Sequence, residues 1–121
     1  AVPDLSTIIC PAWDLIPGCF LAVNYPVKTK VLLTIGLTAR SPTDNRVEMF
    51  ILMDGALIET NECAVSIEGT DWGTGSAQVL VELPAGAHTF EAVWQVNSDC
   101  GGVGEIANRQ AWITAFAIEN N

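Results

Sequence analysis

Residues 30–38 read KVLLTIGLT, and this stretch decides the fold class. Its apolar residues recur at every second position, which places Val31, Leu33, Ile35 and Leu37 on one face. A period of two belongs to a β-strand, whereas the apolar stripe of an amphipathic helix recurs every three to four residues. The stretch therefore predicts a strand with one face in a hydrophobic core.

Further predicted strands lie on both sides of this stretch. Residues 46–53 (RVEMFILM) are apolar on both faces beyond Glu48, as in a strand that is buried on both sides. Asp54 and Gly55 follow at once and predict a hairpin turn of type I′, which needs a positive φ at both positions. The other predicted strands are residues 20–24, 56–59, 63–68, 77–83, 87–96, 103–107 and 111–119.

Polar or glycine-rich turns separate these strands, at residues 40–45, 69–76 and 97–102. Roughly eight or nine short strands without helical periodicity, repeats or a linker predict one all-β domain over residues 1–121. We expect an antiparallel β-sandwich with jelly-roll topology. An immunoglobulin sandwich fits less well, because Trp72 lies in a glycine-rich turn and Ser98 stands where that fold places a tyrosine.

The charge balance excludes several partners. The 121-residue chain has 14 acidic and 5 basic residues and a net charge of −9. Five scattered basic residues cannot form the surface that nucleic acid or an anionic membrane requires. Half of the residues are hydrophobic, which excludes a disordered chain, yet no apolar run reaches the roughly 20 residues of a membrane span.

Four cysteines, Cys10, Cys19, Cys63 and Cys100, form no C-x-x-C pair, and one histidine is too few to complete a zinc site with them. We expect two disulfides, Cys10–Cys19 and Cys63–Cys100, because the first pair flanks a compact turn-rich segment. Four buried free thiols are the alternative. The amino-terminal Ala1 fits a processed, secreted chain and equally a trimmed one.

Catalytic motifs are absent from the sequence. His88, the single histidine, lies on the same predicted strand face as Phe90 and Trp94 and is interpreted as a core or interface imidazole with a backbone partner. We therefore expect no enzyme and no cofactor. Acidic and amide residues that could bind calcium occur in turns and are interpreted as turn residues, so no metal site is expected: Asp44 with Asn45, Glu68 with Asp71, and Asn97 with Asp99.

Two tryptophans lie in turn-like segments, each beside an acid: Trp13 next to Asp14, and Trp72 next to Asp71. An indole can stack on the apolar face of a sugar while the carboxylate accepts a hydroxyl hydrogen bond. These four residues are the candidate sugar-binding residues. The alternative is that the indoles plug an end of the sandwich. Trp94, Trp112, Phe90 and Phe116 alternate along predicted strands and are expected in the core.

Residues 83–90 read LPAGAHTF, and strand alternation continues through residue 96. A glycine-containing loop, Ile106, Arg109 and an apolar strand ending at Ile118 follow. This closing third resembles the C1q/TNF-like jelly rolls of bacterial surface proteins and phage tail or fibre heads. The resemblance implies a homotrimer at an extracellular or virion surface.

Two functions are therefore weighed. The first is a trimeric structural or adhesive head of a surface appendage, virion or tail fibre, because the chain has more apolar residues than one core of this size needs. Its expected interface is the small-residue row Ala111, Ile113, Ala115 and Ala117, which would let a neighbouring chain approach while the large residues of that strand fill the core. The second is a monomeric, lectin-like module that binds a glycan or another cell-surface ligand through the turn tryptophans.

Overall fold

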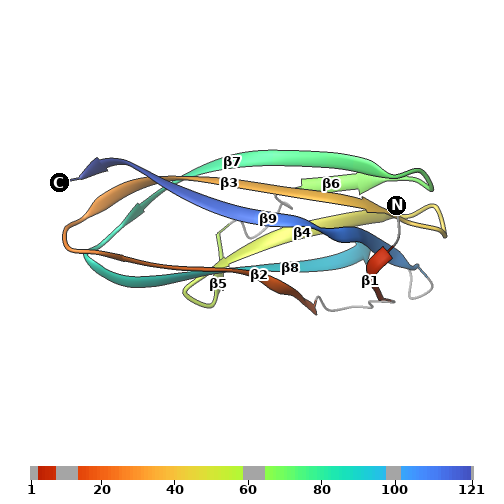
Figure 1. The fold of residues 1–121 in the computed structure, drawn as a ribbon, viewed down its shortest axis with the longest axis horizontal. Coiled ribbons are helices and arrows are strands. Elements are labelled where there is room, and N and C mark those ends of the chain that lie inside the picture. The colour runs from red at the N-terminus through yellow and green to blue at the C-terminus, as the bar shows by residue number, and fades with distance from the viewer. Residues whose placement is uncertain (1–2, 8–13, 59–64, 98–101, 121) are drawn as a thin grey trace.

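The computed structural model describes residues 3–7, 14–58, 65–97 and 102–120, which form nine β-strands and no helix (Figure 1). The strands are β1 (Pro3–Thr7), β2 (Asp14–Tyr25), β3 (Thr29–Arg40), β4 (Arg46–Met53), β5 (Ala56–Leu57), β6 (Val65–Glu68), β7 (Gly73–Leu83), β8 (Gly86–Asn97) and β9 (Gly104–Asn120). The predicted all-β sandwich of the jelly-roll class is confirmed.

The strands form two antiparallel sheets. Sheet A has the order β1-β9-β3-β7, and sheet B has the order β2-β8-β4-β5, with β6 also paired to β4. Neighbours such as β3 and β9 are far apart in sequence, so both sheets depend on long-range pairing. In Figure 1, β3, β7 and β9 run along one side of the sandwich and β2 and β8 along the other.

Alternating side chains from both sheets fill the space between them. Strand β3 contributes Val31, Leu33, Ile35 and Leu37, none of which is exposed, as its period-two pattern predicts. From sheet B come Phe90 and Trp94 on β8, which confirms their expected place in the core. Burial of these large apolar surfaces is the main stabilising contribution in such a sandwich.

The Asp54–Gly55 turn is confirmed, with φ values of 52° and 87° that fit the predicted hairpin. The Asp54 carboxylate also joins the turn to β8. Its Oδ1 accepts a hydrogen bond from the Thr89 backbone N–H (2.8 Å), and its Oδ2 accepts one from His88 Nδ1 (2.7 Å).

His88 is buried and hydrogen-bonded at both ring nitrogens, so its interpretation as a core imidazole with a backbone partner is confirmed. Nε2 donates to the Pro84 carbonyl oxygen (2.7 Å), and Nδ1 faces the Asp54 carboxylate. Both partner atoms are acceptors, so the state that satisfies both bonds is the imidazolium. These bonds raise the pKa of His88, chiefly through Asp54, and the His88 hydrogen bond lowers the pKa of Asp54.

Several predicted boundaries are wrong. Residues 73–76 begin β7 rather than ending a glycine-rich turn. A Cβ at Gly75 would lie 2.8 Å from Val65 Cγ1, so glycine here permits β6 to pack closely against β7. Strand β9 is one continuous strand where two were predicted, β2 begins at Asp14 rather than near residue 20, and β1 was not predicted.

The predicted Cys10–Cys19 disulfide is wrong, because Cys19 is a free thiol. Between Leu15 and Phe20 the register of β2 on β8 shifts, and Ile16 and Cys19 both enter the core there. Cys19 is 6% exposed, and burial raises its pKa to about 11, so the thiol acts as a small apolar side chain. Cys10, Cys63 and Cys100 lie outside the described residues, and the Cys63–Cys100 pairing stays a prediction.

The two faces of β9 are the reverse of the prediction. Ala111, Ile113 and Ala115 pack against the core, whereas Phe116 is 68% exposed and Trp112 is partly exposed. Ala117 is exposed. The small residues face inward because β9 pairs with β3 in the same sheet, and the register partners of Ala115 and Ile113 are the core residues Leu33 and Ile35, which point to the same face. The predicted alanine-row interface is therefore largely inside the sandwich.

No helix in the described ranges is long and apolar enough to cross a membrane.

Candidate functional site

The outer face of sheet A carries the most distinctive set of exposed side chains. It consists of the side chains of β9, β3 and β7 that point away from the core, and the strand register aligns them in rows across the sheet. Each row takes one residue from each strand. Successive rows lie about 7 Å apart along the strands, because every second residue faces outward.

The first of these rows, which we call the apolar row, consists of Phe116, Leu32 and Leu80. Phe116 and Leu80 are 68% and 56% exposed. Leu32 lies between them on the central strand and is partly exposed. Three adjacent apolar side chains on a solvent-facing sheet are a feature that marks binding surfaces.

Trp112 lies across the sheet and covers Gly36. The two residues are register partners, and a Cβ added at Gly36 would meet Trp112 Cζ2 at 1.9 Å and Cε2 at 2.2 Å. The benzene half of the indole therefore occupies the space that a side chain at position 36 would fill. Glycine at this position lets the ring lie on the backbone of β3, and Trp112 remains partly exposed.

Hydroxyl and amide groups fill the rows beside the indole. Thr114, Thr34 and Gln78 form the row between Trp112 and the apolar row. On the other side of the indole, the hydroxyls of Thr38 and Thr74 are 2.7 Å apart and hydrogen-bonded. Ser76, the partner of Gly36 on β7, is exposed as well.

Ion pairs close both ends of this face. At one end Lys28 Nζ lies 2.6 Å from Glu82 Oε1, and the hydrogen bond between them raises the pKa of Lys28 and lowers that of Glu82. At the other end Arg40 Nε donates to Glu105 Oε1 over 2.6 Å. The guanidinium carbon of Arg40 also lies 4.7 Å from the ring centroid of Trp72, within cation–π range.

The residues predicted to bind sugar are not brought together. Trp72 is partly buried and stacks with Arg40 at the end of the outer face, and Asp71 beside it is exposed. Asp14 begins β2 in sheet B, and Trp13 lies outside the described residues. The described indole that lies along the sheet is Trp112, which was expected in the core. Gly36 in the interior of a predicted strand was the available signal, since an interior glycine marks a close approach.

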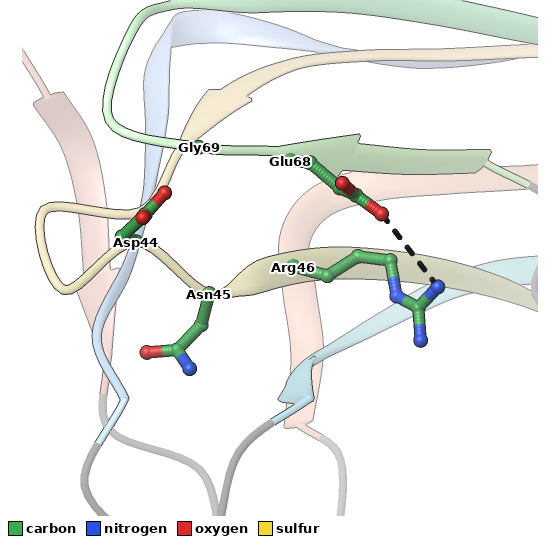
Figure 2. Close-up of a pocket in the computed structure, with 5 residues that line it drawn as sticks. All are labelled: Asp44, Asn45, Arg46, Glu68 and Gly69. Atoms are coloured by element: carbon green, nitrogen blue, oxygen red, sulfur yellow. Dashed lines mark ion pairs between the residues drawn. The ribbon is translucent and has the colours of Figure 1, made fainter.

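A second, polar site lies at the end of the sandwich, in the turn before β4. A cleft of about 680 Å³ is lined by Asp44, Asn45, Arg46, Glu68 and Gly69. In Figure 2 the Asp44 carboxylate points toward Gly69, and the Arg46 guanidinium approaches Glu68. That ion pair is long, at 3.8 Å between Arg46 Nη1 and Glu68 Oε1.

The turn that forms this cleft is held by hydrogen bonds. The buried Ser41 hydroxyl donates to the Val103 carbonyl oxygen (2.6 Å) and accepts from the Asn45 N–H (3.0 Å). Asp44 has a φ of 56° and its N–H bonds back to the Ser41 carbonyl. These contacts agree with the interpretation of Asp44 and Asn45 as turn residues. Within the described ranges, no group of three or more His, Cys, Asp or Glu residues is placed to hold a metal ion.

The outer face of sheet A thus offers an indole lying along the sheet, an apolar row and neighbouring hydroxyl and amide groups. This combination matches a ligand with both apolar faces and hydroxyl edges. The described residues that line the polar cleft, in contrast, include no large apolar side chain on which such a ligand could stack.

Three solved structures of carbohydrate-binding modules are similar to this chain. A family 35 module from an environmental isolate is 14% identical, with a TM-score of 0.46, over 80% of this chain and 63% of its own. A family 35 module from Clostridium thermocellum is 18% identical, with a TM-score of 0.45, over 82% and 68%. A CBM35 module from Paenibacillus barcinonensis is 16% identical, with a TM-score of 0.41, over 80% and 66%.

The chain covers between 63% and 68% of the length of these modules, and the similarity is one of fold. No protein-family model and no curated protein matches the chain.

Proposed function

We propose that this protein is a non-catalytic glycan-binding module whose ligand lies on the outer face of sheet A. The observation that carries the proposal is the placement of Trp112, whose indole covers Gly36 and remains partly exposed. The apolar faces of sugar rings stack on such an indole, and their hydroxyls bond to polar groups at its sides. Thr114, Thr34 and Ser76 are placed to supply those groups.

The non-catalytic part of the proposal is supported by His88. Its ring nitrogens bond to Asp54 and to Pro84, and the side chain is buried on β8 in sheet B, not on the outer face of sheet A. It is therefore not placed to transfer protons to a ligand there. The carboxylates at the ends of that face, Glu82 and Glu105, are each ion-paired to a basic side chain.

A depletion assay with insoluble polysaccharides tests the proposal. The protein is mixed with a panel of these materials, and the fraction removed from solution is measured. We expect Trp112→Ala to lower the affinity by about tenfold, equal to about 1.4 kcal/mol. Phe20→Ala is the control, because Phe20 is an exposed aromatic (56%) on sheet B, away from this face. Failure of every glycan to bind the wild-type protein, or equal losses in both variants, would contradict the proposal.

A second candidate is a C1q/TNF-like trimeric head of a surface appendage, virion or tail fibre. The apolar row favours it, since Phe116 and Leu80 expose large apolar surfaces that an interface would cover. Light scattering decides this candidate: a trimeric mass that Phe116→Glu reduces to a monomer supports it. A monomeric wild-type protein excludes it. Under either proposal the protein acts at an extracellular or virion surface.

A further inference from the structure

We infer that the ligand of the outer face of sheet A is an uncharged, extended polysaccharide chain that lies along the strands. This inference rests on the proposed function and adds the chemical class and the direction of the ligand. Two independent sets of observations lead to it: the distribution of charge over the face, and the order of its rows.

Among the side chains that the structure describes, the centre of the face carries no ionisable group. From the apolar row through the Thr38–Thr74 pair, the outward residues of β3 and β7 are Leu, Thr, Gly, Gln and Ser. The outward residues Trp112, Thr114 and Phe116 of β9 are uncharged as well. Basic side chains bind the carboxylates and sulfates of a polyanionic glycan most strongly, through charge-assisted hydrogen bonds.

Two basic residues at the ends of the face are already engaged in ion pairs. Lys28 pairs with Glu82 at 2.6 Å, and Arg40 pairs with Glu105 at 2.6 Å while covering Trp72. The whole chain carries a net charge of −9, which opposes the approach of an anion. Charge thus favours a neutral ligand over uronic-acid or sulfated polymers.

The order of the rows indicates the direction of the ligand chain relative to the strands. Phe116 and Trp112 are four residues apart on β9, about 13 Å along the strand. The polar row of Thr114, Thr34 and Gln78 lies between them, and the Thr38–Thr74 hydroxyl pair lies beyond Trp112. Along the strands the surface therefore alternates apolar, polar, aromatic and polar. An extended polysaccharide, with ring faces and hydroxyl edges in succession, matches this order better than one isolated sugar.

The first test uses pairs of soluble polymers that differ in charge: hydroxyethyl cellulose with carboxymethyl cellulose, and dextran with dextran sulfate. Affinity electrophoresis is run with wild-type protein, Trp112→Ala and Phe20→Ala. We expect retardation by a neutral polymer that changes less than about twofold when NaCl rises from about 0.05 to 0.5 M, since no charge pairing is screened. We expect Trp112→Ala to weaken the interaction with that polymer by about tenfold and Phe20→Ala to leave it unchanged.

The results separate the two levels of the proposal. Stronger retardation by the anionic polymers, weakened by salt and lost in Trp112→Ala, overturns the neutral class but leaves glycan binding at this face intact. Absence of retardation by all four polymers, together with no binding in the depletion assay, overturns both.

The second test concerns the direction, and it uses calorimetry with oligosaccharides of increasing length from the retarding polymer. Trp112→Ala is expected to weaken every length about tenfold or more. Phe116→Ala is expected to weaken only oligosaccharides long enough to span the roughly 13 Å between the two contacts. Circular dichroism verifies that both variants are folded. If Phe116→Ala has no effect at any length, the ligand does not extend along the strands.

Discussion

Replacing Gly36 with alanine tests the central geometry of the face directly. A Cβ at position 36 would lie 1.9 Å from Trp112 Cζ2, 2.2 Å from Cε2 and 2.5 Å from Cη2. Carbon atoms in ordinary contact are about 3.5 Å apart, so the indole must retreat by about 1.5 Å. Overpacking of this kind costs about 1–3 kcal/mol of stability.

An opposing effect must be separated from this cost. Alanine in a strand interior is more favourable than glycine by about 0.5–1 kcal/mol. Gly36→Ala in the wild-type protein therefore combines a cost with a gain. In a Trp112→Ala background the clash is absent, and the same substitution is expected to stabilise the protein by about 0.5–1 kcal/mol. The coupling energy between the two positions is then about 1–3 kcal/mol.

Urea unfolding of the four proteins in this cycle gives the coupling energy, with circular dichroism as the signal because two of the four lack the Trp112 indole. Phe20→Ala in place of Trp112→Ala is the control, and there the effects of the two substitutions add. If Gly36→Ala changes the free energy of unfolding by the same amount with and without Trp112, within about 0.5 kcal/mol, the placement of the indole on the glycine is refuted. Displacement of the ring also predicts weaker glycan binding by Gly36→Ala.

Three further predictions concern the core. The His88–Asp54 pair stabilises the fold most between pH 3.8 and 6.5. Because the folded state raises the pKa of His88 and lowers that of Asp54, the contribution of His88 is lost as pH rises above 6.5 and that of Asp54 is lost as pH falls below 3.8. Asp54→Asn should therefore flatten the measured profile of stability against pH, and an unchanged profile would refute the pairing. Cys19 should react with a thiol reagent in urea but not in the native protein, and rapid native labelling would contradict its burial. Ala115→Glu should lower the free energy of unfolding by about 2–3 kcal/mol, because Ala115 packs against the core. If the variant is fully stable and light scattering shows a changed molecular mass, the alanine row is an interface between chains after all.

Strand positions could be predicted where alternation is strict and a turn is chemically specific. The stretch around Leu33 and Ile35 lies in β3, and the Asp54–Gly55 pair forms the predicted turn. These features are local, since a period of two and a positive φ depend on neighbouring residues only. The sandwich follows from their number and spacing.

The orientation of β9 could not be predicted, because both of its faces are apolar and alternation does not tell which face is buried. Its register on β3 decides the matter, since Ala115 and Ile113 meet Leu33 and Ile35 while Trp112 meets Gly36. The same limitation explains the wrong disulfide prediction at Cys19. The sequence around position 19 favours a local disulfide, whereas the register shift in β2 places the thiol in the core.

The candidate site was partly predicted, as a glycan surface, but at other tryptophans. Trp72 was chosen because it lies beside an acid in a turn, yet Arg40 stacks on its ring. Phe116 and Leu80 become neighbours only through their common partner Leu32, on three strands that are far apart in sequence. A surface assembled by long-range pairing has no contiguous sequence motif.

The most direct measurement of the central claim is an NMR titration of ¹⁵N-labelled protein with the neutral polysaccharide fragment that binds best. If the glycan lies on the outer face of sheet A, the indole N–H of Trp112 and the amides of Thr34 and Thr114 shift together and saturate with one affinity, while the buried indole of Trp94 stays unchanged. Shifts confined to the cleft around Asp44 and Glu68, or no shifts at saturating glycan, would contradict it.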